Sequence, residues 1–157
     1  SQNDVMLAAV IDTDYGGLKW EPVEDTSNTF KAVVSMSQMT SMLHDDDRNR
    51  KYQMAIEAAV AQFMSKEGRP PVVLDIGTGT GLLAMMAARA GAEKVYACEM
   101  FTTMADIAAE VTKQNCGDKI KVIAKRSTDL IIGNDGDMAE KADILVTEIF
   151  DSILLGE

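Results

Sequence analysis

The sequence is poor in the side chains that most often hold metals or carry relay catalysis. It contains a single histidine, His44, and two cysteines, Cys98 and Cys116, which are too far apart in the chain for a paired metal-ligand motif. A histidine-based metal site or a serine–histidine–aspartate relay therefore has little to draw on, and we predict no metal site. So few cysteines also favour a reducing, intracellular compartment over an oxidising one.

Long apolar runs and an excess of basic charge are absent as well. No run approaches the ~18 apolar residues of a membrane span. The first residues lack the basic start and apolar block of a signal peptide, so we expect no membrane partner. The formal charge of −10 argues against direct binding of nucleic acid, which needs a basic surface. It suits a partner rich in lysine and arginine, although simple solubility accounts for it equally well.

The chain does contain enough apolar material for one domain, with 157 residues of which 46% are hydrophobic. Residues 1–35 follow no regular pattern, and we expect them to be irregular. From about Ser37 to Lys66, apolar residues recur at steps of three and four, which predicts helices over residues 36–68. The apolar stripe consists of Tyr52, Ala55, Ile56, Ala59, Val60 and Phe63. The stretch EGRPP cannot continue a helix and ends it.

Residues 69–157 alternate between strand-like and helix-like patterns. Apolar runs predict strands over 72–76, 94–99, 119–125 and 142–148, and the segments between them predict helices over 82–90 and 102–115. Strands that alternate with helices imply a parallel sheet with right-handed crossovers. We therefore expect an α/β fold in which residues 69–157 form a Rossmann-like, cofactor-binding half-sheet.

The stretch DIGTGTG places Gly77, Gly79 and Gly81 directly after the first of these strands and before a helix. Glycine lets the backbone pass close to a ligand, and the start of the helix presents free N–H groups. Open α/β sheets bind nucleotides at this position. The dinucleotide fingerprint is G-x-G-x-x-G, whereas these glycines alternate, which favours a nucleoside without phosphates. A tight turn without a ligand is the alternative.

Two acids flank the glycine loop. Asp75 precedes it and can accept hydrogen bonds from loop N–H groups or, through water, from a ligand amine. Glu99 ends the next strand and is suited to accept hydrogen bonds from both hydroxyls of a ribose, unless it is only a solvated strand end. We predict S-adenosyl-L-methionine as the cofactor, because it joins an adenosine without phosphates to a cationic sulfonium that an acidic pocket favours.

Arg48 belongs to the stretch SMLHDDDRNRKY, before the sheet. An arginine on a helix beside the ligand site can clamp a carboxylate with two parallel hydrogen bonds. The other interpretation is a surface ion pair with Asp45 or Asp47.

The stretch TEIFDSILLGE contains two acids, Glu148 at the end of the last strand and Glu157. Glu148 is expected at the sheet edge that carries the glycine loop, where such sheets bind ligands. A guanidinium is planar and always charged, and two carboxylates offset the cost of bringing it near a cationic methyl donor. They also orient one nitrogen toward the methyl group. The alternative is that both acids are merely solvated.

Four stretches, MLHDDDRNRKY, VVLDIGTGTGLL, KVYACE and ADILVTEIFDSILLGE, occur in this order and together resemble the protein arginine methyltransferase family. The resemblance implies part of the class I S-adenosylmethionine-dependent methyltransferase fold, namely its first four parallel strands and the preceding helices. Residues 36–68 would be N-terminal lid helices. The C-terminal strands, β-barrel and dimerisation arm of that family are missing from this sequence. The resemblance therefore implies a fragment that is inactive alone and lacks the C-terminal part of the same enzyme.

The resemblance also implies a role for each site residue. Arg48 would hold the cofactor carboxylate, and Glu99 would bind the ribose. The residues expected beneath or beside the rest of the cofactor are Met42, Asp75, Gly77, Gly79, Gly81, Ser127 and Thr128. Glu148 and Glu157 would be the catalytic acids of a double-E loop, and Asp151 within it would set substrate specificity.

The function that the resemblance implies is transfer of a methyl group to a guanidinium nitrogen of arginine in proteins, with S-adenosylhomocysteine as product. Members of this kind are type III enzymes, which add one methyl group. Expected partners are arginine-rich proteins such as histones or RNA-binding proteins, in cytoplasm and nucleus. Two alternatives are a methyltransferase-like cofactor-binding or interaction module without turnover, and half of a nicotinamide oxidoreductase.

Overall fold

The computed structural model describes residues 7–12, 17–22 and 42–149. The first two ranges are the antiparallel strands β1 (Leu7–Asp12) and β2 (Gly17–Pro22). This pair corrects the expectation that residues 1–35 are wholly irregular. Each strand has only six residues, which is too short for its apolar pattern to identify it before its partner is known. The predicted boundary between residues 35 and 36 lies outside the described residues.

The helix α2 (Asp46–Glu67) ends within one residue of its predicted end. Asp45 caps its start, because the Asp45 carboxylate accepts a hydrogen bond from the Arg48 main-chain N–H at 3.0 Å. Gly68 ends it in the left-handed conformation, with φ of 69°. The predicted start near Ser37 lies outside the described residues.

The apolar stripe of α2 is buried or half-buried at all positions but one. Its covered members are Tyr52, Ile56, Ala59, Val60 and Phe63. Ala55 is exposed, contrary to the stripe that the sequence predicts. It lies directly before Ile56, at the margin of the face that α2 presents to the rest of the domain, and its small side chain does not reach further in.

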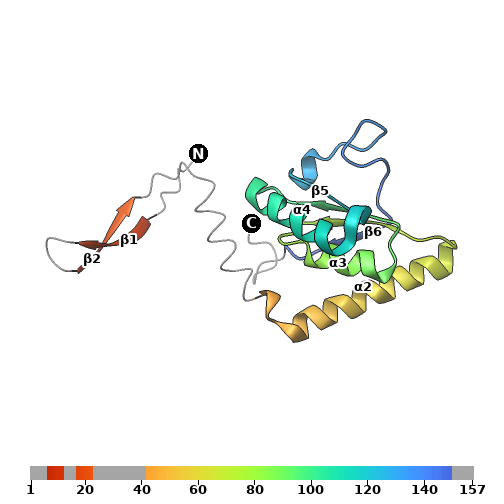
Figure 1. The fold of residues 1–157 in the computed structure, drawn as a ribbon, viewed down its shortest axis with the longest axis horizontal. Helices are drawn as coiled ribbons and strands as arrows, with labels where there is room; N and C mark the ends of the chain where they lie inside the picture. Colours follow the sequence, from red (N-terminus) through yellow and green to blue (C-terminus); the bar gives the residue numbers. More distant parts are fainter. Residues whose placement is uncertain (1–6, 13–16, 23–41, 150–157) are drawn as a thin grey trace.

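The predicted half-sheet is present. Its strands are β3 (Val72–Ile76), β4 (Lys94–Cys98), β5 (Ile120–Ile123) and β6 (Ile144–Thr147), which run parallel in the order β5-β4-β3-β6. Figure 1 labels the two outer strands of this sheet, β5 and β6. The helix α3 (Leu82–Ala90) connects β3 to β4, and the helix α4 (Thr102–Cys116) leads from β4 toward β5. Two short 3-10 helices, η1 (Gly117–Lys119) and η2 (Ser127–Asp129), flank β5.

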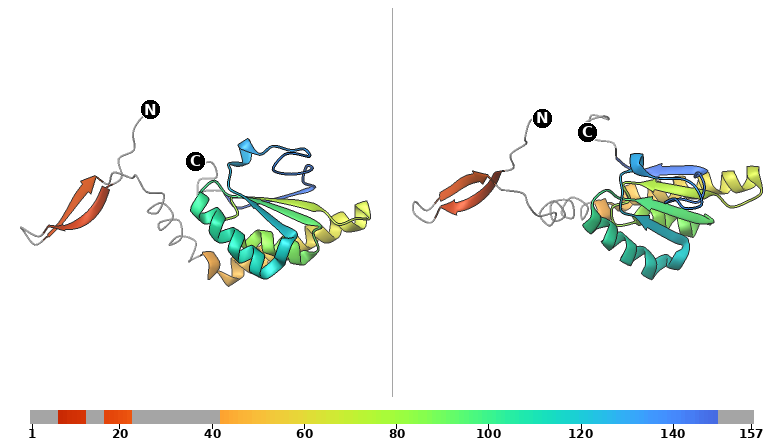
Figure 2. Two further views of the ribbon diagram at one scale, coloured as in Figure 1. Left: turned by 45° about the horizontal axis from the view of Figure 1, so that its top comes forward. Right: turned by 90° about the horizontal axis from the view of Figure 1, so that it is seen from above.

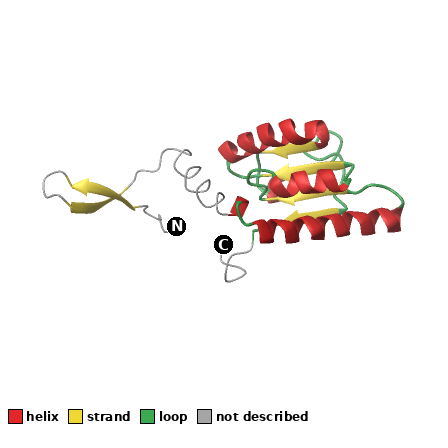
Figure 3. Ribbon diagram, turned by 60° about the horizontal axis from the view of Figure 1, so that its bottom comes forward, coloured by secondary structure: helices red, strands yellow, loops and turns green. Residues whose placement is uncertain are grey.

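The two faces of this sheet are covered differently. The helices α2, α3 and α4 form one layer against one face (Figures 2 and 3), where Val73 and Val95 are fully buried. On the other face, Val72, Tyr96 and Cys98 pack with Met138 from the segment between β5 and β6. This arrangement leaves the carboxyl ends of all four strands at one edge. No helix within the described residues is long and apolar enough to cross a membrane.

Candidate functional site

The glycine loop lies at this carboxyl edge and follows a path that side chains would obstruct. Gly77, Gly79 and Gly81 have φ of 70°, 56° and 88°. A Cβ added to Gly77 would lie 2.8 Å from Cγ2 of Ile149, and one added to Gly81 would lie 2.5 Å from Cγ2 of Thr112. The loop is therefore pressed between the end of β6 and α4. Only glycine combines this conformation with such close approach.

Asp75 supports the loop from beneath. Its side chain is 1% exposed, and Oδ2 accepts a hydrogen bond from the Thr78 hydroxyl at 2.6 Å. Burial raises the pKa of Asp75 to about 6, against the opposing effects of Thr78 and the Ala84 N–H, while the charge of Glu99 raises it further. Oδ1 has no hydrogen-bond partner among the described residues. A buried acceptor without a partner at a ligand-binding edge is suited to a donor from a ligand or water.

Glu99 joins the glycine loop to the segment after β4. It is 6% exposed, so the alternative of a solvated strand end is wrong. Oε2 accepts a hydrogen bond from the Gly79 N–H and Oε1 accepts one from the Phe101 N–H, both at 3.1 Å. An ionised carboxylate has about four acceptor positions, so Glu99 can hold the loop and still accept from two hydroxyl groups.

Arg48 and Glu148 meet across the pocket, one hundred residues apart in the chain. Nη2 of Arg48 lies 2.9 Å from Oε2 of Glu148, and the guanidinium carbon lies 4.9 Å from the centre of the Tyr52 ring. Their side chains are 23% and 31% exposed, respectively. Desolvation and the negative charge of Glu148 raise the pKa of Tyr52, and the charge of Arg48 opposes them.

The alternative of a surface ion pair for Arg48 is not what the structure contains. Asp45 bonds to the main chain of Arg48 and caps the helix. Asp47 instead pairs with Lys51 and Arg50, which hold the pKa of its carboxyl below the usual value.

A pocket of about 100 Å³ collects several of the predicted residues. The predicted residues that line it are Met42, Arg48, Gly77, Gly79 and Glu148, and the others are Leu43, Thr78, Thr80, Leu82 and Leu83. Gly81 belongs to the loop, and Asp75 and Glu99 support it, but none of these three residues lines the cavity. The missed threonines belong to the glycine stretch itself, so its full extent, rather than its glycines alone, was the signal that could have found them.

Two predicted adenine contacts do not line this pocket. Ser127 and Thr128 are exposed on η2, beyond β5, where the Thr128 hydroxyl donates to the Asp129 carboxylate at 3.2 Å. Their role stays a prediction. Asp151 and Glu157 lie outside the described residues.

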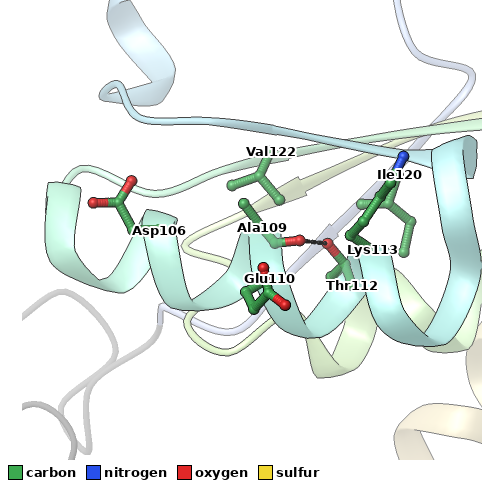
Figure 4. Close-up of a pocket in the computed structure, with 7 residues that line it drawn as sticks. All are labelled: Asp106, Ala109, Glu110, Thr112, Lys113, Ile120 and Val122. Carbon is green, nitrogen blue, oxygen red and sulfur yellow. Dashed lines mark hydrogen bonds between the residues drawn. The ribbon is translucent and has the colours of Figure 1, made fainter.

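A second pocket of about 380 Å³ lies between α4 and β5 (Figure 4). Its polar lining includes Asp106, Glu110 and Lys113 from α4, and Lys113 pairs with Asp118. Thr112 also lines it, with its hydroxyl donating to the Ala109 carbonyl at 3.3 Å. None of the predicted site residues contributes to this pocket.

The groups at the first pocket fit a ligand that joins a nucleoside to an amino acid. Arg48 can bind a carboxylate, Asp75 offers an unused buried acceptor, and Glu99 keeps acceptor positions for hydroxyls. The loop itself follows a path on which an added Cβ at Gly77 or Gly81 would meet the side chain of Ile149 or Thr112. Within the described residues, no group of three potential metal ligands comes together.

The model of the ribosomal protein L11 methyltransferase family (PrmA) matches residues 51–156. Protein arginine N-methyltransferase 7 of Gallus gallus is 50% identical over 143 residues, which are 90% of this chain and 20% of that protein. The chain therefore belongs to the methyltransferase family that this model describes, and it is similar to protein arginine N-methyltransferases over most of its length. Its fold is therefore that of a class I methyltransferase, and the alternative of a nicotinamide oxidoreductase is set aside.

Further relatives agree with this family. Protein arginine N-methyltransferase 7 of Aedes aegypti is 48% identical over 79% of this chain and 18% of that protein. The chain thus spans about a fifth of the length of the curated relatives it matches.

Two solved structures are also similar to this chain. The Trypanosoma brucei PRMT1 enzyme-prozyme complex with AdoHcy matches with a TM-score of 0.63 and 34% identity, over 74% of this chain and 33% of that one. Arabidopsis thaliana Protein Arginine Methyltransferase 10 matches with a TM-score of 0.64 and 32% identity, over 79% and 33%.

Proposed function

We propose that this chain forms the first part of the catalytic domain of an S-adenosylmethionine-dependent protein arginine N-methyltransferase. One observation carries the substrate assignment. Glu148, at the carboxyl end of β6 and beside the glycine loop, already binds a guanidinium, that of Arg48, at 2.9 Å. A site that accepts this group from its own chain has the charge and the shape to accept it from a substrate arginine.

The cofactor would lie along the glycine loop. Arg48 would bind its carboxylate, Glu99 its ribose hydroxyls, and Asp75 would take a donor on Oδ1, directly or through water. Ser127 and Thr128 would border the adenine, and Met42 would lie near the transferred methyl group. When bound, S-adenosylmethionine supplies a methyl group on a cationic sulfonium that a nitrogen can attack. A structural relative in complex with AdoHcy supports this assignment.

Glu148 and Glu157 would hold the substrate guanidinium from two sides. Hydrogen bonds to charged groups contribute about 1.5–3 kcal/mol each, and the pair of negative charges lowers the Coulomb cost of placing two cations together. Correct alignment of the attacking nitrogen contributes further, because methyl transfer requires an in-line approach. Asp151, between the two acids, would shape the entry of the substrate.

Arg48 would have to exchange partners for this reaction. In the structure its guanidinium occupies Glu148, the acid assigned to the substrate. A carboxylate bound at the glycine loop would compete for the same guanidinium. Cofactor binding would then release Glu148, so we infer that cofactor precedes the arginine substrate.

The finer assignments are also proposals. We propose a type III enzyme that adds one methyl group to arginine-rich proteins such as histones or RNA-binding proteins, in cytoplasm and nucleus. The formal charge of −10 supports a basic protein partner. We further propose that the chain is inactive alone, because the relatives it matches are about five times longer.

The test is Glu148→Gln in a full-length version of the protein, compared with Glu140→Gln, an exposed acid in the segment before β6. We expect Glu148→Gln to lower methyl transfer to an arginine-rich peptide by about 100-fold or more, the scale seen when one group that stabilises a transition state is removed. Binding of S-adenosylhomocysteine, measured by calorimetry, should persist. A normal rate of methyl transfer in this variant contradicts the assignment.

A second function, a cofactor-binding module without turnover, is favoured by the same ion pair, since Glu148 is occupied within the chain. Calorimetry and the peptide assay on the unmodified full-length protein separate the two. S-adenosylhomocysteine binding without any methylated product from arginine-rich peptides supports the module, whereas product supports the enzyme.

A further inference from the structure

Asn49 holds together three of the residues that line the first pocket, although it does not line the pocket itself. Its Oδ1 accepts a hydrogen bond from Nη1 of Arg48 at 3.1 Å. Its Nδ2 donates to the main-chain carbonyls of Met42 and Leu43, both at 3.1 Å. One amide group thus connects the arginine of the pocket to the turn that carries two other lining residues.

The helix itself does not require an amide at this position. Asn49 lies in the first turns of α2, where asparagine is a weaker helix former than alanine, and the helix is already capped by Asp45. All three of its side-chain hydrogen bonds lead to the N-terminal side of α2 and to Arg48, rather than to the core. Its contacts therefore point to the pocket as the reason for its presence.

We propose that Asn49 is a positioning residue that orients Arg48 toward the carboxylate of the cofactor, an inference that rests on the proposed function. Arg48 uses Nη2 for Glu148 and Nη1 for Asn49. When Nη2 changes partner, Nη1 can keep its bond to Asn49, so the plane of the guanidinium is retained. Because the amide is neutral, it orients the guanidinium without competing for its charge as an aspartate at this position would.

The test is Asn49→Ala in the full-length protein, with Gln53→Ala as the matched control. Gln53 carries the same amide one turn later on α2, where it donates to Glu57 at 2.8 Å, away from the pocket. Calorimetry measures Kd for S-adenosylhomocysteine, which has the carboxylate, and for 5′-methylthioadenosine, which lacks the amino-acid part. We expect Asn49→Ala to raise Kd for the first about tenfold and for the second less than twofold, and Gln53→Ala to change neither.

A double-mutant cycle with Arg48→Ala decides whether Asn49 acts through Arg48. In the Arg48→Ala background, Asn49→Ala should change Kd for S-adenosylhomocysteine less than twofold. Equal weakening of both ligands, or the same tenfold loss without Arg48, overturns the positioning role. Asn49→Leu repeats the test should the alanine variant fold poorly. If Arg48→Ala alone leaves S-adenosylhomocysteine binding intact, the proposed cofactor site fails; if it weakens binding but Asn49→Ala does not, only this inference fails.

Discussion

Replacing Asp75 by asparagine should affect the stability of the fold more favourably at pH 8 than at pH 4.5, while weakening cofactor binding. The carboxyl is 1% exposed, and burial raises its pKa from 3.8 to about 6. The native state therefore binds more protons than the unfolded state between these two values. It follows that this carboxyl lowers the free energy of unfolding as pH rises through that window, and that the cost is complete above pH 6. An amide of nearly the same shape carries no such cost.

The magnitude follows from the two pKa values. One pKa unit corresponds to about 1.36 kcal/mol, so the carboxyl costs about 3 kcal/mol at pH 8 and about 1 kcal/mol at pH 4.5. The asparagine also has a cost of its own, because its Nδ2 group would be buried with no acceptor in the position of Oδ1, which costs about 1–3 kcal/mol. That cost is the same at both pH values. The change in stability caused by the substitution should therefore be about 2 kcal/mol more favourable at pH 8 than at pH 4.5.

Urea denaturation of both proteins at pH 4.5 and pH 8, followed by circular dichroism, measures this difference. The other acids titrate in both proteins, so their contributions cancel when the variant is compared with the parent. An effect of Asp75→Asn that is equal at the two pH values would refute the conclusion that burial raises this pKa. Calorimetry with S-adenosylhomocysteine at pH 8 should show weaker binding by the variant, because the unused acceptor is lost.

Two further predictions concern the loop and the ion pair. Gly81→Ala should lower the free energy of unfolding by about 2–4 kcal/mol in urea denaturation, since an added Cβ would meet Thr112 at 2.5 Å and φ is 88°. Gly68→Ala, where φ is 69° but nothing lies within 4 Å, is its control and should cost about 1–2 kcal/mol; equal losses would contradict the close packing at Gly81. Glu148→Gln should tighten S-adenosylhomocysteine binding by up to about fivefold, because a partly exposed ion pair is worth about 0.2–1 kcal/mol and Arg48 would no longer have to leave it. Tenfold weaker binding would mean instead that Glu148 holds Arg48 in its binding position.

The sequence predicts the bounds of the strands and helices of the half-sheet most closely where glycines mark their ends. The bounds of β3 and α3 were predicted to the residue, because a branched apolar run ends in the glycine loop and Gly91 follows the helix. The predicted strand over 119–125 was longer than β5, which ends at Ile123. Basic side chains extend the pattern of a strand, but pairing with β4 decides where it stops. The strands β1 and β2 were not predicted, because each is short and is recognised as a strand only by its pairing with the other.

The site was predictable in its residue types but not in its pairings. A position at the end of a predicted strand is enough to single out the glycines, Asp75, Glu99 and Glu148. The contact between Arg48 and Glu148 joins two residues one hundred positions apart, which no local pattern can indicate. The contacts of Asn49 were not predictable from the sequence. An amide beside an arginine on a polar helix surface looks like its solvated neighbours until the partners of its three hydrogen bonds are placed.

The pocket has a fixed floor and an exchangeable roof, and this difference has a consequence for binding. The floor is the glycine loop, held by the buried carboxylates of Asp75 and Glu99 and pressed against Thr112. Because these contacts are buried, releasing them is costly, and the loop is preformed for its ligand. The roof is the ion pair of Arg48 and Glu148, whose side chains are 23% and 31% exposed. Because the pair is partly exposed, water can replace either partner at little cost. A ligand that bears a carboxylate therefore needs to rearrange only the roof, and the same rearrangement uncovers the acid that a guanidinium would require.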